Sequence, residues 1–553
     1  MKYRELCDYY KRLEETTKNL EMRNIVAELL KKAPIDDLEL ITLASMGRVF
    51  PASVDKDIGI AGKLMQKVIS RAYGASKKEV VGKFKETGDL GRTAEYFCEN
   101  KRQRSLMKKE LSVDKVFKNL RRLPETTGKG SEERKDRLIR ELLVSAEPTE
   151  ACYIVRTTLQ EMRIGVGEGT VRDAISKAFD VPKEKVEQAF FKLTDYGKVA
   201  MIAREDGEGG LDKVDIEVGR PLRMMLAEIS DSLEDALNAY DNPAVEVKLD
   251  GFRGQIHKNG REIKLFSRRL EDKTDQFPEV TEWARECLKP ERCIVDCEIV
   301  AVDDDARPLA FQNLSKRIQR KYDIKRMVKK IPVQVNCFDL FYVDGESYME
   351  RSLRDRWSKL KEIVKEKEGR FGLVDHIETD DMEKANMFYQ KALDQNQEGV
   401  MVKNMDAVYQ PGKRVGYWKK VKETMEPLDL VVVEGIWGEG KRSQWISSLM
   451  LAARDPDTGD FLKTGKMATG MTEEQLQEIT SRINGLILAE DGRTVKVRPE
   501  IVVEVGYEEI QRSPKYDTGY ALRFPRLMRF RYDKSVEEVD TIERLKSLYN
   551  KQG

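Results

Sequence analysis

The feature that most limits the fold of this chain is a change in the spacing of its apolar residues around residues 205–222. Before this segment, apolar residues recur three and four positions apart, which is typical of amphipathic helices. After it, short stretches alternate between apolar and polar residues, which is typical of strands. The segment itself, EDGEGGLDKVDIEVGRPL, is rich in glycine and ends beside a proline, so it predicts a domain boundary.

A chain of 553 residues is long enough for several domains, and we expect three. Residues 1–215 are expected to be all-α, residues 216–424 to be α+β, and residues 425–553 to form a small β-barrel with a C-terminal helix. Thr170 is the predicted N-cap of one of the helices. Two series of apolar residues at helical spacing carry the all-α prediction: Met22, Ile25, Val26, Leu29, Leu30, and Val171, Ala174, Ile175, Ala178, Phe179.

The composition gives little information about binding partners but does indicate a cellular compartment. The 99 basic and 98 acidic residues nearly cancel, so any nucleic-acid binding must depend on local basic surfaces. Seven cysteines without a CxxC pair argue against a disulfide framework or a zinc ribbon and favour a reducing cytoplasm. The charged N-terminus and the lack of a long apolar run predict no signal peptide and no membrane span.

A lysine near the end of one predicted strand is the main catalytic candidate. In the segment VEVKLDG, the side chains alternate between two faces, with Val245, Val247 and Leu249 on one and Glu246, Lys248 and Asp250 on the other. A lysine amine attacks phosphorus only when it is unprotonated, and its ordinary pKa is about 10.4. A catalytic lysine would therefore need cationic or desolvated surroundings, whereas an exposed strand lysine would not.

The motifs that follow resemble those of the covalent nucleotidyltransferases, and among them the ATP-dependent DNA ligases of the archaeal and eukaryotic type. The resemblance covers essentially the whole chain, and the segments occur in the family's order. They are Lys248-Leu249-Asp250-Gly251 with Arg253, Phe266-Ser267-Arg268, Val295-Asp296-Cys297-Glu298, Phe338-Asp339-Leu340, Glu398-Gly399-Val400-Met401-Val402-Lys403, Trp418-Lys419-Lys420-Val421-Lys422, and Arg523-Phe524-Pro525 through Arg531-Tyr532-Asp533-Lys534.

This resemblance implies an all-α DNA-binding domain, an α+β nucleotidyltransferase (adenylation) domain and an OB-fold domain, with ATP as AMP donor and Mg²⁺ as metal. Lys248 would carry the AMP, and Glu298 and Glu398 would serve the metal. The other implied nucleotide-site residues are Glu246, Arg253, Arg268, Glu298, Phe338, Arg414, Lys420, Lys422, Arg531 and Lys534. Taken singly, Phe338 also fits a core aromatic, Arg414 a loop arginine, and each glutamate a salt bridge. The C-terminal domain would move about a hinge near residues 425–427.

Two segments of the first domain resemble partner-binding elements of the same family. Residues 163–170 lead into a helix N-terminus, whose free amides suit a phosphate of nicked double-stranded DNA. The implied DNA contacts are Arg163, Gly165, Gly167 and Thr170, although an ordinary glycine turn would read the same way. Gln103, Leu106 and Met107 resemble a degenerate peptide for the sliding clamp (PCNA) that lacks the usual aromatic pair. The basic run 316–330 fits either a solvated helix face or a DNA-facing one.

Other functions remain open on the sequence. An RNA ligase or an mRNA-capping guanylyltransferase shares the lysine motif and the barrel, but the long helical domain favours a DNA ligase. An NAD-dependent ligase would need a four-cysteine zinc site that the sequence lacks. A non-catalytic DNA-binding or clamp-binding scaffold would take no label on Lys248. We expect a cytoplasmic, nucleoid-associated monomer that acts in replication, repair and recombination.

Overall fold

The computed structural model describes residues 1–54, 56–101, 110–303, 305–309, 311–318, 320, 322–395, 397–422, 425–438 and 444–551. These residues divide into two compact units, Met1–Met387 with Met401–Lys420 and Phe388–Val400 with Val421–Gly553. We describe each unit by itself. In the described residues, no helix is long and apolar enough to cross a membrane.

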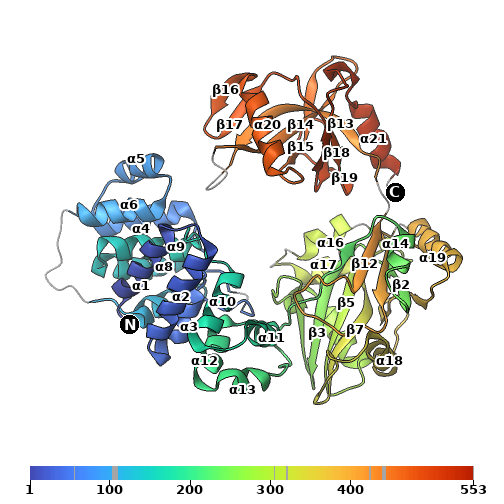
Figure 1. Cartoon of the computed structure of the whole chain (residues 1–553), viewed down its shortest axis with the longest axis horizontal. Coiled ribbons are helices and arrows are strands. Elements are labelled where there is room, and N and C mark those ends of the chain that lie inside the picture. The colour runs from blue at the N-terminus through green and yellow to red at the C-terminus, as the bar shows by residue number, and fades with distance from the viewer. Residues whose placement is uncertain are drawn as a thin grey trace. The chain divides into compact units, whose positions relative to one another are not determined.

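The N-terminal part of the first unit is helical, as predicted, and its helices share one hydrophobic core (Figure 1). The apolar series that predicted a helix near residue 22 lies on the buried face of its second helix. The helices are α1 (Tyr3–Glu14), α2 (Asn19–Lys32), α3 (Ile35–Ala44), α4 (Gly62–Tyr73), α5 (Lys77–Thr87), α6 (Leu90–Glu99), α7 (Val113–Arg121), α8 (Ser131–Ser145), α9 (Pro148–Leu159), α10 (Glu168–Phe179), α11 (Lys183–Leu193), α12 (Tyr196–Glu205) and α13 (Gly207–Asp212).

One detail of the sequence prediction is wrong. Helix α10 is capped by Gly167 and begins at Glu168, so Thr170 lies inside its first turn rather than at the N-cap. The glycine-rich stretch after residue 205 forms the short helix α13, within the range 1–215 that is expected to be helical. Gly207, with φ of +61°, makes the sharp turn between α12 and α13, a conformation that glycine adopts without strain.

The segment that follows α13 is tied to strand β3 (Phe252–Asn259) by buried side chains. The Gly219 amide donates to His257 Nδ1 at 3.0 Å, and the Leu222 amide donates to Gln255 Oε1 at 2.8 Å. His257 Nε2 lies 2.8 Å from the same Gln255 oxygen, so the imidazole is neutral, with its proton on Nε2. Burial and, to a lesser degree, Lys264 lower the pKa of His257 from 6.5 to about 3.

Stability should therefore depend on His257 below neutral pH. As the pH falls from 6.5 toward 3, His257 binds a proton in the unfolded chain but stays neutral in the folded chain. The free energy of unfolding then falls, by up to about 1.4 kcal/mol per pH unit. We expect His257→Asn, which removes the titration, to show a shallower loss in denaturant unfolding between pH 7 and 4.5. A stability difference between wild type and variant that stays constant with pH would contradict this.

The rest of the first unit is built on two sheets (Figure 1). One runs in the order β4 (Glu262–Ser267), β3, β5 (Arg292–Val302), β7 (Val333–Val343) and β8 (Glu346–Ser347), with β6 (Pro308–Leu309) on β5 and β9 (Phe371–Leu373) on β7. The other runs β1 (Glu228–Ile229), β12 (Trp418–Lys422), β11 (Gly399–Asn404), β2 (Pro243–Lys248) and β10 (His376–Glu378). The accompanying helices are α14 (Leu233–Leu237), η1 (Thr274–Gln276), α15 (Pro278–Cys287), α16 (Phe311–Ile318), α17 (Ile324–Lys330), α18 (Leu353–Ile363) and α19 (Met382–Asp394).

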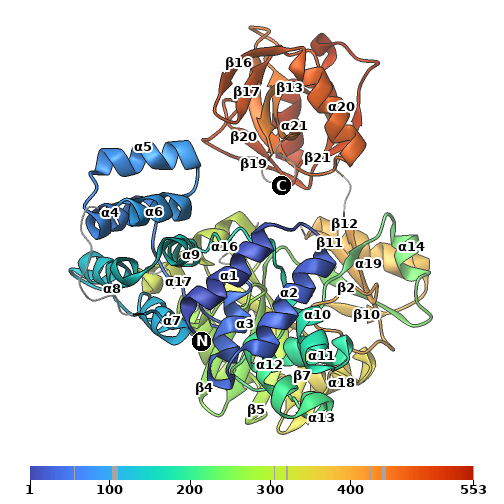
Figure 2. The ribbon, with the colours of Figure 1, turned by 60° about the vertical axis from the view of Figure 1, so that its left-hand side comes forward.

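The second unit is rich in strands, and its helices α20 and α21 contribute to its core (Figure 2). Its main sheet is β15 (Phe461–Met467), β14 (Ile446–Arg454), β13 (Leu428–Trp437), β17 (Thr494–Val497) and β16 (Ile487–Asp491), with β18 (Val502–Gly506) joining β13 to β21 (Arg526–Phe530). A hairpin of β19 (Glu509–Arg512) and β20 (Tyr520–Arg523), the helices α20 (Glu473–Asn484) and α21 (Ile542–Lys551), and η3 (Val536–Glu538) complete it. In the described part of this unit, the strand pairings do not close the sheet into a barrel.

Candidate active site

Lys248 is the last residue of β2, where the strand leaves the sheet. Contrary to the predicted alternation, Asp250 lies beyond the strand, and its Oδ2 accepts the Phe311 amide at 3.0 Å. A side chain at position 251 would meet the Ile299 carbonyl oxygen at 2.6 Å, so only glycine fits there. The glycine of the motif therefore lets the Lys248 loop pass close over β5.

Lys248 lines a pocket of about 220 Å³ whose charged groups are mainly cationic. A cluster of like charges with few counter-ions is a site for an anion such as phosphate. Burial, together with the guanidinium groups of Arg253 and Arg414, lowers the pKa of Arg268, as expected where cations crowd. The charged lining residues are Lys248, Arg253, Arg268, Lys403, Arg414 and Lys420, against Glu246 and Glu298.

Glu246 is a buried carboxylate at the side of this pocket, held by two partners. Lys403 contacts its Oε2, and His376 Nδ1 lies 3.1 Å from its Oε1. Burial alone would favour the neutral acid, but the Lys403 and His376 contacts bring the pKa of Glu246 below its ordinary value. The pocket thus holds a fixed, ionised hydrogen-bond acceptor.

An aromatic wall lies beside these charges. The rings of Phe338 and Trp418 meet edge to face at 6.1 Å. Lys403 Nζ lies 4.6 Å from the centroid of the Phe338 ring, and the Arg253 guanidinium lies 5.4 Å from it. Such a wall can stack on a flat heteroaromatic ring, with cations nearby for its phosphates.

Arg253 lines the pocket, yet its guanidinium already donates hydrogen bonds to other groups of the protein. Its Nη2 binds Asp296 Oδ2 at 2.6 Å, its Nη1 donates to the Met225 carbonyl at 2.8 Å, and Tyr409 Oη lies 3.4 Å away. Asp296 is fully buried, and burial raises its pKa despite the arginine. The sequence anticipated Arg253 as a ligand-binding group but not the protein contacts that fix its guanidinium.

Glu298 is a second acidic side chain in the lining of this pocket, and its carboxylate could bind a metal. Burial raises its pKa to about 8, although Lys248 and Arg253 oppose the shift. A carboxylate that is costly to ionise alone would be stabilised by a divalent cation. Mg²⁺ takes few protein oxygens and completes its shell with phosphate oxygens and water, so one pocket carboxylate fits it. In the described residues, no cluster of three or more metal-binding side chains occurs.

Four of the predicted site residues lie in the second unit. Lys422 pairs with Glu398, so the predicted second metal carboxylate has a cationic partner here. Arg531 Nη1 binds both Asp429 oxygens, at 2.9 and 2.8 Å, and Lys534 binds Asp429 as well. The two basic residues of the last motif therefore share one carboxylate.

The predicted DNA-contact loop leads into α10, and its residues Arg163, Gly165 and Gly167 are exposed. Arg163 has φ of +58°, an unusual conformation for a residue with a side chain. The predicted clamp residues Gln103, Leu106 and Met107 lie outside the described residues. In the basic run 316–330, Arg317 is fully buried and bonds to Glu279, so it serves the fold.

Several pocket residues were not anticipated as site residues. Lys403 is the next-to-last residue of the apolar strand β11, and a lysine that follows a buried run is a usable sequence signal. Trp418 directly precedes Lys419 and Lys420 in β12, and the sequence pointed to it only as part of a motif. Lys403 adds a cation to the pocket, and Trp418 adds a ring to its aromatic wall.

The comparisons with known proteins show the family of this chain. The sequence matches the family models DNA ligase N terminus over residues 2–176, ATP dependent DNA ligase domain over 224–422 and ATP dependent DNA ligase C terminal region over 442–534. DNA ligase of Thermococcus onnurineus is 43% identical over all of this chain and 98% of its own length. DNA ligase of Archaeoglobus fulgidus is 42% identical over 100% and 99%.

A solved structure, Pmar-Lig_PreS3, shares the fold with a TM-score of 0.58 at 17% identity, over 95% of this chain and 99% of that chain. The chain belongs to the ATP-dependent DNA ligase family.

Proposed function

We propose that this protein seals nicks in duplex DNA with ATP, through a lysyl-AMP and then a DNA-adenylate intermediate. One observation carries the site assignment: Lys248 shares its pocket with Arg268, Arg414 and Lys420, and with the Phe338 wall. A nucleophile, an anion site and a ring-stacking surface in one pocket are what nucleotidyl transfer requires.

The reaction consists of three transfers at phosphorus. The unprotonated Lys248 amine forms a bond to the α-phosphate of ATP, and the bond to pyrophosphate breaks. A 5′-phosphate oxygen at the nick then attacks that phosphorus and releases the lysine. Finally the 3′-hydroxyl, after losing its proton, attacks the activated 5′-phosphate, and AMP leaves with the electron pair.

The roles that we assign to the site residues are those that the family resemblance implies. Glu246 would accept a hydrogen bond from the adenine amine, and Phe338 would stack on the base. Arg253 and Glu298 would bind near the ribose and phosphates, while Glu298, with Glu398, would hold Mg²⁺. When bound, this ion neutralises negative charge on phosphate oxygens. The phosphates would be bound by Arg268, Arg414, Lys420 and Lys422.

The remaining parts of the proposal concern domains and partners. We assign residues 1–215 to DNA binding, 216–424 to adenylation and 425–553 to an OB-fold that brings Arg531 and Lys534 to the triphosphate about a hinge at residues 425–427. Nicked DNA would meet the loop of Arg163, Gly165, Gly167 and Thr170. A sliding clamp would bind Gln103, Leu106 and Met107. The protein would act as a cytoplasmic, nucleoid-associated monomer.

A pulse-chase experiment tests this function. The protein is stripped of bound AMP, labelled with α-labelled ATP and Mg²⁺, freed of nucleotide, and chased with nicked DNA or a matched nicked RNA. We expect the label to leave the protein and sealed strands to form on DNA, faster than on RNA. Label from GTP instead would indicate a capping enzyme, and no label with any nucleotide would indicate a scaffold.

A further inference from the structure

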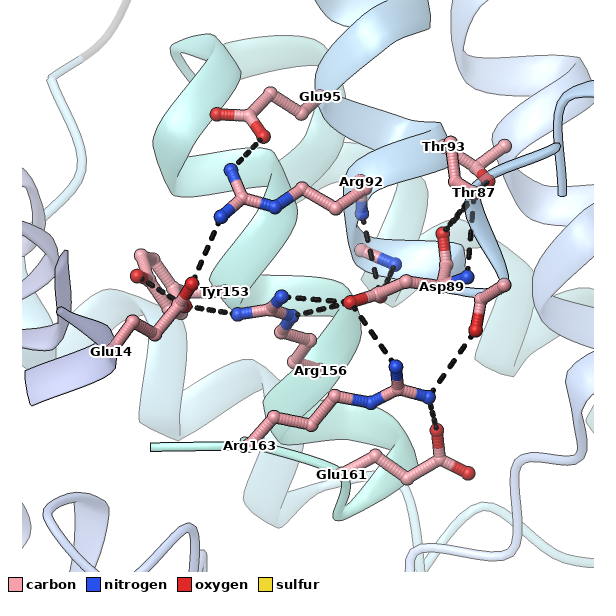
Figure 3. A network of polar contacts seen from close by, with 12 residues as sticks. Glu14, Thr87, Asp89, Arg92, Thr93, Glu95, Tyr153, Arg156, Glu161 and Arg163 are labelled. Carbon is pink, nitrogen blue, oxygen red and sulfur yellow. Dashed lines mark hydrogen bonds and ion pairs between the residues drawn. The ribbon is translucent and has the colours of Figure 1, made fainter. Parts of the chain in front are cut away.

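A buried ionic network lies directly under the loop that carries Arg163 (Figure 3). Its centre is Asp89, with a side chain only 7% exposed. One carboxylate oxygen of Asp89 accepts the Arg156 guanidinium at 2.7 Å. The other accepts the Gly91 amide at 2.7 Å and the Arg92 amide at 3.4 Å, so Asp89 also caps α6.

Arg156 itself is anchored on its far side. It reaches Glu14 of α1, whose Oε1 also accepts the Tyr153 hydroxyl at 2.6 Å. Residue 91 must be glycine, because an added Cβ would lie 2.7 Å from Arg156 Cγ and 2.8 Å from the Cys152 carbonyl oxygen. This close approach of α6 to α9 leaves the Asp89 carboxylate little room to move.

The network reaches the surface through Arg163. Its Nη1 lies 3.8 Å from Asp89 Oδ2, and its Nη2 donates to the Gly88 carbonyl at 3.3 Å. The exposed Glu161 carboxylate lies 3.7 Å from the same Nη2. The Arg163 side chain is 51% exposed, so these contacts leave part of the guanidinium open to a ligand. Its backbone is in the left-handed region, with φ of +58°.

The charge of Asp89 is largely neutralised within the protein. Although burial favours the neutral acid, Arg156 and the Gly91 amide hold the pKa of Asp89 below its ordinary value. An anion whose charge is already balanced by a buried arginine repels a nearby phosphate little. Asp89 can therefore fix an arginine at a DNA-facing surface without opposing the DNA.

We propose that Asp89 is a positioning residue for DNA binding, which holds the Arg163 guanidinium at the surface so that it binds a backbone phosphate. This inference rests on the proposed function of the 163–170 loop. It predicts that loss of the Asp89 charge weakens DNA binding. Simple electrostatics predicts the opposite, because removing a negative charge near DNA should strengthen binding.

The test measures the dissociation constant of the full-length protein for a nicked duplex by fluorescence anisotropy, over a series of salt concentrations. We expect Arg163→Gly to weaken binding about tenfold and to lower the salt slope by about one. Asp89→Asn should weaken binding about threefold to tenfold. In the double variant, Asp89→Asn should add nothing to Arg163→Gly, because its effect acts through that arginine.

The matched control is Asp136→Asn. Asp136 is also a buried carboxylate of the helical part, paired with Arg71 at 3.2 Å and Arg140 at 3.6 Å, but it has no contact with Arg163. It should leave binding and salt slope unchanged, which separates positioning from a general loss of stability. Arg163→Lys serves if Asp89→Asn fails to fold. Lysine keeps the charge but cannot contact Asp89 and the Gly88 carbonyl at the same time, so we expect weaker binding.

The results distinguish failure of the loop contact with DNA from failure of the positioning role of Asp89. If Arg163→Gly binds DNA like wild type, the loop contact fails and the positioning role fails with it, while the labelling of Lys248 is unaffected. If Arg163→Gly weakens binding but Asp89→Asn does not, or if their effects multiply, the positioning role alone is overturned.

Discussion

Replacing Lys248 with alanine is expected to abolish lysyl-AMP formation and to lower nick sealing by on the order of 10⁴-fold or more. The variant removes the only atom that forms the covalent intermediate, and the remaining pocket groups can bind ATP but have no nucleophile to aim at it. Labelling with α-labelled ATP, followed by a denaturing gel and peptide mapping, measures the first effect. Ligation of a nicked duplex measures the second.

The chemistry also predicts what Lys248→Ala should retain. The last step needs no lysine nucleophile, so the variant should still seal a nick that carries a ready-made 5′-adenylate. The control is Lys264→Ala, which removes a half-exposed lysine from strand β4 of the other sheet and should label and seal normally. Label that persists in Lys248→Ala, at any mapped residue, would refute the assignment of the nucleophile.

The second large effect is on stability. Asp339 and Arg356 form a fully buried ion pair, with Nε to Oδ1 at 2.7 Å and Nη2 to Oδ2 at 3.1 Å. Arg356 Nη1 also donates to the carbonyls of Arg351, at 2.8 Å, and Ala407, at 3.1 Å. Arg356→Leu would leave a buried carboxylate without its counter-ion, so we expect a loss of about 3–5 kcal/mol in the free energy of unfolding.

The same helix offers a matched control. Arg354, two residues earlier in α18, pairs with Glu378 where both side chains are largely exposed, at 44% and 40%. Arg354→Leu should therefore change stability by less than about 1 kcal/mol. Asp339→Leu combined with Arg356→Leu should recover part of the loss, because no charge remains buried. Equal effects of the two single variants in denaturant unfolding would contradict this explanation.

Local pattern was sufficient to predict most of the strands and helices. The stretch Val333–Val343 is almost uninterrupted by charge, and it forms a strand that is buried nearly throughout. Near residue 207, inside the range expected to be helical, glycine forms a tight corner between two helices. Sequence spacing does not predict this corner, because the corner is fixed by packing between α12 and α13.

Pocket residues that stand in a sequence motif were predicted, whereas those that join the pocket through a tertiary contact were missed. Lys248, Arg268 and Glu298 could be found because each stands in a recognisable pattern. The partnership of Lys403 with Glu246 joins positions 157 residues apart, and no periodicity connects them. The Asp89–Arg163 contact is likewise a product of tertiary structure, although Asp89 directly precedes a helix start.

The buried Glu246 has a consequence for the choice of nucleotide. Because Lys403 keeps this carboxylate ionised, it can accept the amine of adenine but offers nothing to the carbonyl of guanine, which would face it with repulsion. That discrimination does not fade when the surroundings acidify by a unit or two. On the proposed role of Glu246, the preference for ATP would therefore persist at mildly acidic pH.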